Sequence, residues 1–308
     1  MNVTLRHLRT FVAVAKQGSF TRAAATLCVS QPTVTKTIIE LESVIGVPVF
    51  ERSTREISLT PYGSTLLSDA AKILNDLDIA LESINSQISG YTGKLRFACG
   101  LAFASAVMPQ VIKTLNAKDP RIQVELIDDT SGGVIRRIES GEVDLGVGSY
   151  VGTAANVLKV HHLLSARLSV LFPPGYQNIP SAVTPEDLVG MPILRDFEDS
   201  SIAATMRASE PDTWGRMTQR VSVSNLDLQI SLVREGVGAC IMSAVAASHS
   251  AARGMAFRLI SSPELKRDIY IFSRLNAHLS PAAARLLDIL LETLPTIDFV
   301  DGVELGML

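Results

Sequence analysis

Three short amphipathic stripes, separated by polar breaks, make up the first 46 residues. The first covers residues 8–15 and stops at Gly18, and the second follows Ser19, a residue type that commonly caps helices. The third follows Ser30, and its apolar positions fall within about 60° of one another on a helix. These positions are Val34, Ile38, Leu41 and Ile45. The spacing predicts three helices around a small core.

The polar face of the third predicted helix is suited to reading DNA. A helix-turn-helix enters the major groove with a second helix that points small polar groups and a cation, here Lys36, outward. Gln31 at the helix start can make bidentate contacts to a base edge, and Thr33 and Thr35 can reach a base or a phosphate. Pro32 fits the first helical position, where no N–H is required. Periodicity alone favours a plainer interpretation, a three-helix bundle with a solvated charged face.

Two short runs after Gly46 predict a small hairpin. Residues 49–52 and 56–59 read as two strands, with Ser53, Thr54 and Arg55 at the tip. Such a tip can lie on the phosphate backbone, where it adds affinity without reading sequence. The pattern indicates a wing.

A long helix is predicted next, because Thr60 and Pro61 suit the N-cap and first helical positions. Its apolar residues alternate at spacings of three and four until Gly90: Leu67, Ala70, Leu74, Leu77, Leu81, Ile84 and Ile88. A core helix of a single domain is an alternative source of this pattern. The strict alternation favours a helix that pairs with its twin in a dimer.

Beyond residue 93 the pattern changes to alternating strands and helices. A strand is predicted at 94–99, a helix at 106–116, a strand at 122–126, a helix ending at Gly141 and a strand at 143–148. Strand, helix and strand recur at 221–223, 226–234 and 238–242. This order is typical of parallel α/β sheets, here in two lobes. Strands at 167–172 and 267–273 are predicted to cross between the lobes.

A cleft between two such lobes binds small molecules, because helix N-termini aim free N–H groups into it. Five loops with hydroxyls or backbone donors fit this position: 100–105, 129–133, 148–152, 194–196 and 222–225. For any single Ser or Thr the simpler interpretation is a helix N-cap without a ligand.

Charge is informative only when it is divided along the chain. The 308 residues carry a net charge of −3, which by itself argues against a nucleic-acid partner. Residues 1–65 hold seven Lys and Arg against four Glu, a net of +3, so the other 243 residues carry −6. A basic head on an acidic body indicates an N-terminal nucleic-acid module.

Several classes of protein are not expected. The N-terminus lacks a signal-peptide core, and the best uncharged stretch, 236–252, is too short and too polar to span a membrane, so we expect a cytoplasmic protein. Three separate cysteines predict no disulfide and no structural zinc. The five histidines have no metal-ligand spacing, no GxSxG motif is present, and residues 146–152 miss the dinucleotide fingerprint by one position. We expect no metal, no cofactor and no enzyme.

The residues also match a family pattern. The run 11–24 (FVAVAKQGSFTRAA), Leu27, 30–36 (SQPTVTK), Ile39, Leu41-Glu42, Gly46, 50–52 (FER) and 59–63 (LTPYG) strongly resemble LysR-type transcriptional regulators. Weaker signals, such as Pro120, 141–146 and 236–238, extend the resemblance over the full length.

The resemblance implies a winged helix-turn-helix at 1–60, a linker and dimerisation helix at 61–90 and a two-lobed α/β effector domain, similar to periplasmic binding proteins, at 91–308. Lobe I would comprise about 93–165 and 267–308, and lobe II about 166–266. The implied assembly is a dimer through the linker helix and a tetramer overall.

Site residues also follow from the resemblance. DNA contacts are implied for Ser30, Gln31, Pro32, Thr33, Thr35, Lys36, Arg52 and Arg55. The effector would be bound by Ala102, Phe103, Thr130, Ser131, Ser149, Tyr150, Arg195, Ser224 and Asn225. Many members have Ser or Thr where this chain has Ala102 and Phe103, which makes a partly apolar effector plausible. Only Cys240 lies in the second lobe, so we do not expect redox sensing.

We therefore predict a DNA-binding transcriptional regulator whose activity is modulated by a small-molecule effector between the lobes. Its partners would be double-stranded operator DNA, further copies of the chain and RNA polymerase, with no membrane. The alternative is a cytoplasmic small-molecule-binding protein or an enzyme on a bilobal α/β fold.

Overall fold

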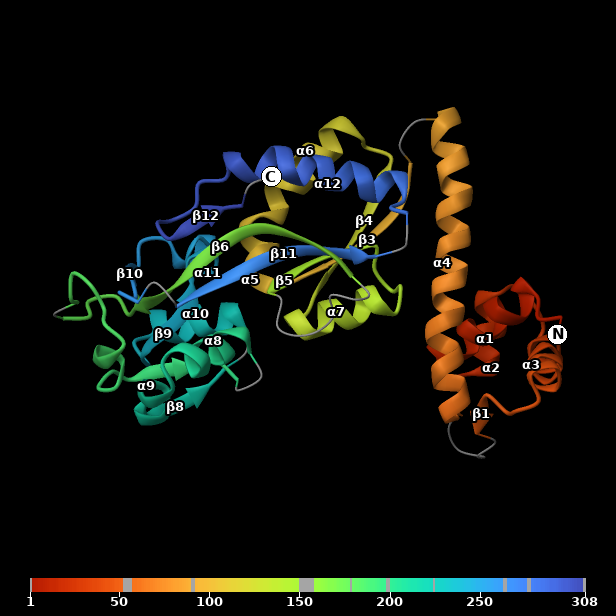
Figure 1. Cartoon of the computed structure of the whole chain (residues 1–308), viewed down its shortest axis with the longest axis horizontal. Helices are drawn as coiled ribbons and strands as arrows, with labels where there is room; N and C mark the ends of the chain where they lie inside the picture. The colour runs from red at the N-terminus through yellow and green to blue at the C-terminus, as the bar shows by residue number, and fades with distance from the viewer. Residues whose placement is uncertain are drawn as a thin grey trace. The chain divides into compact units, whose positions relative to one another are not determined.

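The structure, a computed structural model, describes residues 2–51, 57–89, 92–149, 158–177, 179–197, 200–223, 225–262, 265–275 and 278–306 (Figure 1). The chain forms two compact units. One comprises residues 1–90 with 139–142, and the other residues 91–138 with 143–308. Each unit has its own hydrophobic core.

Three helices form the N-terminal head, as the periodicity predicts: α1 (Leu5–Gln17), α2 (Phe20–Thr26) and α3 (Gln31–Ile45). Local signals set their ends. Thr4 and His7 form a reciprocal capping box at the start of α1, and Gly18 ends that helix with a φ of 54°, which glycine adopts without strain. At the start of α2 the Ser19 hydroxyl accepts a hydrogen bond from the Arg22 N–H.

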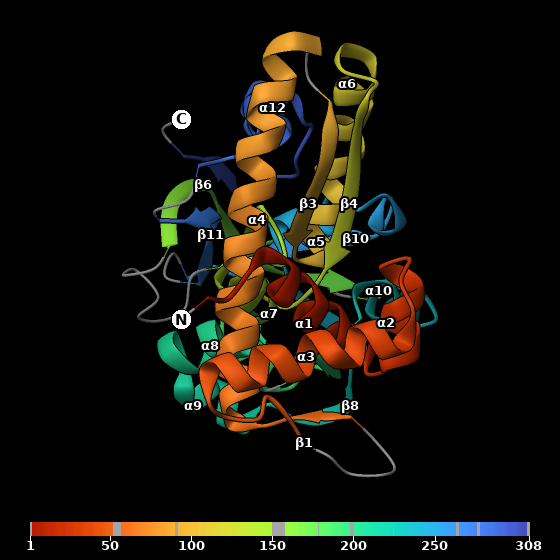
Figure 2. The ribbon, with the colours of Figure 1, turned by 90° about the vertical axis from the view of Figure 1, so that its right-hand side faces the viewer.

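A two-stranded hairpin follows the helices, with β1 (Phe50–Glu51) antiparallel to β2 (Ser58–Leu59). The Phe50 ring lies 5.4 Å from the Phe11 ring and 5.8 Å from the Phe20 ring. These aromatic contacts anchor the hairpin to α1 and α2. Figure 2 shows β1 together with α1, α2 and α3 in the head. The predicted tip of the wing, residues 53–55, lies outside the described residues.

The long helix α4 (Pro61–Ser89) completes this unit. Thr60 caps it as predicted, because its Oγ1 accepts a hydrogen bond of 3.0 Å from the Gly63 N–H. Glycine is required at position 63, since a Cβ there would collide with the carbonyl oxygen of Val49.

The first half of the α4 seam belongs to the head. Ala70 is fully buried in the head core, and Leu67 and Leu74 pack against that core. Our prediction that the whole seam serves dimerisation is therefore wrong for Ala70 and incomplete for its two neighbours. Three short helices leave one side of their core uncovered, and the first turns of α4 cover it.

The second half of the seam is open. Leu81 and Ile84 have exposed fractions of 50% and 60%, and Leu77 is half-buried. The side chain of Ile88 lies outside the described residues. Among the described seam residues, Leu81 and Ile84 are the most exposed to a partner.

The second unit begins with a parallel sheet, as predicted. Its strands are β3 (Gly93–Cys99), β4 (Ile122–Asp128) and β5 (Leu145–Ser149), and β3 pairs in parallel with both neighbours. Helices α6 (Met108–Lys118) and α12 (Pro281–Thr293) pack on one face, and α7 (Ser131–Glu139) on the other. We call this part the first lobe. The sequence did not predict α5 (Leu101–Ala106), which ends at Val107, directly before α6.

The second lobe repeats the order with β7 (Ile193–Arg195), β8 (Gln219–Ser222) and β9 (Ala239–Ser243), where β7 is parallel to both others. Its helices are α8 (Ser201–Ser209), α9 (Pro211–Arg216), α10 (Leu226–Arg234) and α11 (Ala244–Ala247). Short 3₁₀ turns lie at Glu186–Leu188, Ser250–Ala252 and, in the first lobe, Leu294–Thr296. The Trp214 side chain is buried in this lobe's core.

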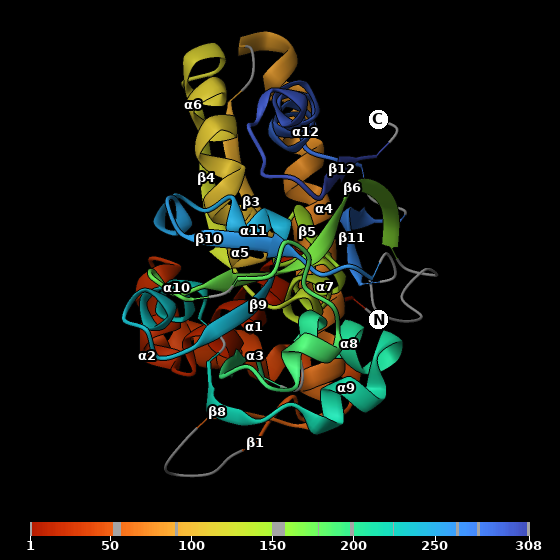
Figure 3. The same cartoon turned by 90° about the vertical axis from the view of Figure 1, so that its left-hand side faces the viewer.

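Two long antiparallel strands connect the lobes, β6 (Leu158–Phe172) and β11 (Lys266–Arg274) (Figure 3). β6 pairs with β11 and β12 (Val303–Leu305) in the first lobe, and with β9 and β10 (Ala256–Leu259) in the second. The crossing at 167–172 is confirmed, but β6 begins nine residues earlier. A register shift between Ile269 and Tyr270 interrupts the alternation that would have indicated the earlier start. No helix in the described ranges is long and apolar enough to cross a membrane.

Candidate functional site

The outward face of α3 carries the predicted DNA-contacting side chains. Gln31, Pro32, Thr35, Lys36, Ile39 and Glu40 surround a shallow hollow on this face. Neighbours one turn apart bond to each other: the Gln31 amide donates to the Thr35 hydroxyl at 3.0 Å. The Lys36 ammonium lies 3.9 Å from Glu40 and is 79% exposed. The face is thus polar, ordered by local pairs and open to solvent.

The start of α3 differs in detail from the prediction. The helix begins at Gln31, so Pro32 occupies the second helical position rather than the first. Either position tolerates proline, because the first four N–H groups of a helix have no acceptor within it. Ser30 is the N-cap residue, but its hydroxyl makes no cap bond and instead lies 2.8 Å from the Thr33 hydroxyl.

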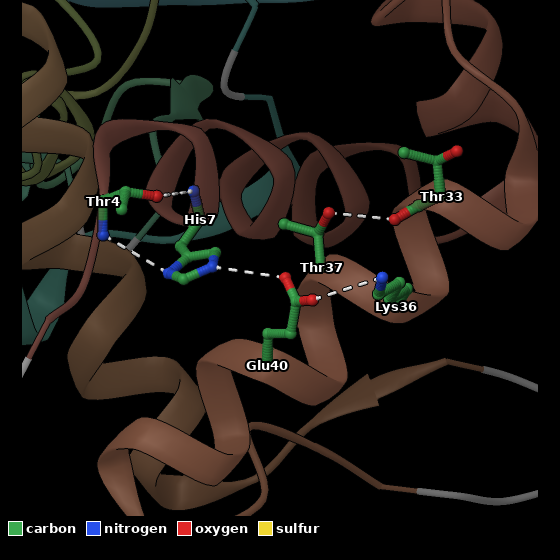
Figure 4. Close-up of polar contacts among 6 residues, drawn as sticks. All are labelled: Thr4, His7, Thr33, Lys36, Thr37 and Glu40. Atoms are coloured by element: carbon green, nitrogen blue, oxygen red, sulfur yellow. Dashed lines mark hydrogen bonds and ion pairs between the residues drawn. The ribbon is translucent and has the colours of Figure 1, made fainter.

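Glu40 connects this face to the first helix of the head (Figure 4). One carboxylate oxygen lies 3.7 Å from His7 Nε2, and the other faces the Lys36 ammonium. His7 is itself held by the capping box with Thr4. The carboxylate therefore offsets part of the positive charge that Lys36 presents to solvent, a feature that the sequence analysis missed.

Arg52 and Arg55, the predicted wing contacts, lie outside the described residues. Their contact with DNA stays a prediction.

A cleft of about 540 Å³ opens between the two lobes. Its first-lobe lining comes from Gly100–Ala102, Asp128–Gly132, Ile135 and Ser149. The second lobe contributes Asp196, Ser200–Ile202, Ala204, Asn225, Leu226, Gln229, Met242, Ser243 and Ala246, and β11 contributes Arg267. Segments that are far apart in sequence meet here, as predicted for a bilobal α/β protein.

Helix N-termini surround the cleft, and several hydroxyls that line it accept hydrogen bonds from the first N–H groups of these helices. The Thr130 hydroxyl accepts from the Gly133 N–H at 3.1 Å, and Ser200 accepts from Ala203 at the same distance. Asn225 caps α10 through its side-chain oxygen. The simpler interpretation offered for these side chains, an N-cap, is confirmed for Thr130 and Asn225.

Five of the nine predicted effector residues line the cleft: Ala102, Thr130, Ser131, Ser149 and Asn225. Two do not. Phe103 is only 3% exposed and packs in the first-lobe core, because α5 turns it away from the cleft. Arg195 lies over the Trp214 ring, 3.7 Å from its centroid, so cation–π stacking occupies it.

Tyr150 and Ser224, the other two predicted effector residues, lie outside the described residues.

Arg267 is the principal cleft residue that the sequence analysis missed. Its Nη2 donates to the Ser149 hydroxyl at 3.0 Å, and its Nε is buried without a hydrogen-bond partner in the described part of the chain. Burial lowers the pKa of Arg267 to about 10, although the charge of Asp196 opposes this shift, so the side chain is positively charged at neutral pH. The strand at 267–273 was predicted, but only its position in the crossing pair brings residue 267 to the cleft.

Asp129, at the rim, is neutralised by a neighbour. Burial raises the pKa of this carboxyl, but hydrogen bonds from Arg137 and the Thr130 N–H, together with the charges of Arg137 and Arg136, outweigh burial and lower it. The Arg137 bond measures 2.7 Å. Among the residues that the structure describes, no three His, Cys, Asp or Glu side chains gather as a metal site would need.

Two family models match the chain. "Bacterial regulatory helix-turn-helix protein, lysR family" matches residues 5–64, and "LysR substrate binding domain" matches residues 89–295. Among curated relatives, the uncharacterized HTH-type transcriptional regulator YfeR of Shigella flexneri is 27% identical over 94% of each chain. The transcriptional activator LysR of Escherichia coli is 26% identical over 84% of this chain and 83% of its own length.

Solved structures agree in fold. A full-length OxyR variant from Pseudomonas aeruginosa has a TM-score of 0.76 at 21% identity, covering 100% of this chain and 99% of its own. Full-length CbnR in complex with its target DNA has a TM-score of 0.67 at 21% identity, covering 94% and 100%. With both halves of the chain matched, from the helix-turn-helix through the bilobal cleft, the protein belongs to the LysR family of DNA-binding transcriptional regulators with an effector-binding domain.

Proposed function

We propose that the chain regulates transcription in response to a small metabolite held between its two lobes. The observation that carries this proposal is the cleft itself, lined by helix starts from both lobes and by one buried arginine. A molecule bound there contacts both lobes, so it stabilises one arrangement of the lobes over another. This shift changes how the paired DNA-binding heads lie on an operator. Small-molecule binding is a property of the family's effector domain.

We further propose that DNA is contacted by Ser30, Gln31, Pro32, Thr33, Thr35 and Lys36, with Arg52 and Arg55 from the wing. The exposed polar face of α3 supports the first six. A major groove admits a helix of this kind, and Gln31 can pair with an adenine edge. The wing arginines would add phosphate contacts that strengthen binding without adding sequence preference.

The active assembly in this proposal is a dimer through the open half of α4, with Leu77, Leu81, Ile84 and Ile88 at its centre, and a tetramer overall. The exposed apolar residues Leu81 and Ile84 support it, because water contact at such residues is lost when helices pair. We also propose the boundaries 1–60, 61–90 and 91–308 for its domains, a cytoplasmic location and RNA polymerase as a partner.

The test is a footprint of the purified chain on the DNA upstream of its own gene and of the neighbouring divergent gene, repeated with candidate metabolites. We expect a protected site whose length or bending changes with one metabolite class. Protection that no metabolite alters would contradict effector control, and absence of any protected site would contradict the DNA assignment.

A further inference from the structure

Arg267 lies on the cleft wall. It lines the cleft, its Nη2 bonds to Ser149, and its Nε is buried with no hydrogen-bond partner among the described residues. The charged guanidinium is largely removed from water, and a negatively charged group in the cleft offsets part of the cost of this burial. The guanidinium is a planar fork that matches two oxygens of one group better than it matches a single oxygen.

The hydroxyl beside it is fixed. Ser149 is 5% exposed, its hydroxyl accepts from Arg267, and its own N–H donates to the Ser131 hydroxyl at 3.0 Å. These two bonds tie β11, β5 and the start of α7 together at one point of the cleft. The fork is therefore held in place before a ligand arrives, which lowers the entropy cost of binding.

The charges around the cleft limit how much negative charge a ligand can carry. Asp128, Asp129 and Asp196 also line the cleft, and Asp129 is already bonded to Arg137. Asp196 lies close enough to Arg267 to influence it electrostatically. A ligand with two or more negative charges would meet one lining arginine and two further carboxylates, so a single negative charge fits best.

The rest of the lining favours an apolar body. Leu101, Ala102 and Ile135 come from the first lobe, and Ile202, Leu226 and Met242 from the second. Ala102 offers no hydroxyl, so this part of the wall does not compete with Arg267 for an anion. Apolar ligand surface on these side chains contributes affinity in proportion to its area.

From this arrangement we infer that the effector is a small monocarboxylate with an apolar body, whose carboxylate is bound by Arg267 and Ser149; the inference rests on the proposed function and specifies its ligand. The carboxylate accepts from the Arg267 guanidinium where it lines the cleft, and the apolar body lies between the two lobes. Phosphate, sulfate and dicarboxylates are excluded by the lining aspartates.

The experiment is calorimetric titration of the full-length protein with benzoate and hexanoate, their neutral amides benzamide and hexanamide, and the dianions succinate and sulfate. We expect at least one monocarboxylate to bind, its amide to bind about 10- to 100-fold more weakly, and neither dianion to bind, since one charge-assisted hydrogen bond distinguishes the pair. Equal affinity for acid and amide, preference for a dianion, or no binding by either acid would overturn the inference.

Variants assign the effect to the arginine. Arg267→Gln should lose most of the preference for acid over amide, and Arg267→Lys, which keeps the charge but not the fork, should retain part of it. Lys266→Gln is the matched control, because Lys266 is the neighbouring cation on β11, is exposed and does not line the cleft. Preference retained in Arg267→Gln overturns the inference.

Loss of folding is separated from loss of the ligand contact by measuring DNA affinity and the near-ultraviolet circular dichroism of each variant. If the wild type protects DNA and responds to a neutral metabolite or a dianion while Arg267→Gln behaves like wild type, only this inference fails. If no metabolite alters protection, the proposed function fails with it.

Discussion

The outward face of α3 and the wall of the cleft carry similar polar side chains, but these side chains are paired differently and differ in burial. On α3 the pairs are local and lie in water: Gln31 bonds to Thr35 four residues away, and Lys36 faces Glu40. In the cleft, Arg267 bonds to Ser149, which is 118 residues away in the chain, and part of its guanidinium has no partner in the described ranges. One site is built from pairs that are close in the sequence, and the other from groups that are far apart in it.

The difference shows how each site is suited to its ligand. An exposed ion pair is worth about 0–1 kcal/mol, so a DNA phosphate can replace Glu40 beside Lys36 at little cost. A buried charge is costly, so the cleft gains most from a ligand of opposite charge. Affinity for DNA should therefore come from many replaceable contacts, and affinity for the effector from one.

The largest effect is expected from a substitution that destabilises the head and leaves the unit with the cleft intact. Gly63→Val forces a side chain onto the Val49 carbonyl oxygen, and we expect it to destabilise the head by about 3 kcal/mol and to abolish DNA binding. Because the cleft lies in the other unit, effector binding should persist. Fluorescence anisotropy with labelled DNA and calorimetry measure the two; loss of both activities would contradict the separation.

The next test asks whether DNA binding needs two paired heads, whereas each cleft binds its effector independently. Leu81→Asp should lower the oligomer mass in sedimentation and weaken DNA binding by about 100-fold, because two linked heads bind through effective concentration. Ile73→Asp is the matched control, since Ile73 is 52% exposed on the same helix but off the seam. An unchanged mass in Leu81→Asp, or an equal loss in Ile73→Asp, would count against pairing through α4.

A smaller effect concerns the exchangeable pair on α3. Lys36→Ala should weaken DNA binding and reduce the salt slope by about 1 per head, whereas Glu40→Gln should strengthen binding by less than about 1 kcal/mol because it frees the lysine charge. Lys113→Ala, an exposed lysine of α6, is the control. Binding isotherms at several salt concentrations give both quantities, and changes of the same sign in the Lys36 and Glu40 variants would refute the exchange.

The smallest effect lies at the rim of the cleft. The lowered pKa of Asp129 means that its ionised form favours the folded state, a contribution present above the unfolded pKa of about 3.9 and lost as pH falls through the folded value. Arg137→Gln should lower the free energy of unfolding by about 1 kcal/mol at pH 7 and by less at acidic pH. Urea denaturation at pH 7 and pH 3 measures this; an equal loss at both values would mean that the bond is not electrostatic.

Much of the fold was predictable because its signals are local. Gly18, Ser19 and Thr60 mark helix ends by their own conformations and hydroxyls, and the structure uses each as predicted. The head, the long helix and the order of strands and helices follow from such signals. Strand β6 was predicted too short, because its register with β11 shifts opposite Ile269 and Tyr270, and this shift breaks the alternation of residues along β6.

The two candidate sites also differ in how far local signals in the sequence predict them. The α3 face could be predicted residue by residue, because a helix places residues four apart side by side. In the cleft, loops were predicted correctly but individual side chains were not: Phe103 packs in a core and Arg195 stacks on Trp214. Loop membership does not determine the direction of a side chain.

By itself, then, the sequence determined the three short helices and the long helix, the alternation of strands and helices after them, which face of α3 is polar, and that a basic head precedes an acidic body. Only the tertiary structure decided that Ala70 belongs to the head core rather than to a partner, and that Arg267 lies buried in the cleft. The physical reason is the distance along the chain over which each feature is determined. Caps and periodicity depend on neighbours within a few residues, whereas burial and unmet hydrogen bonds depend on which distant segments pack together.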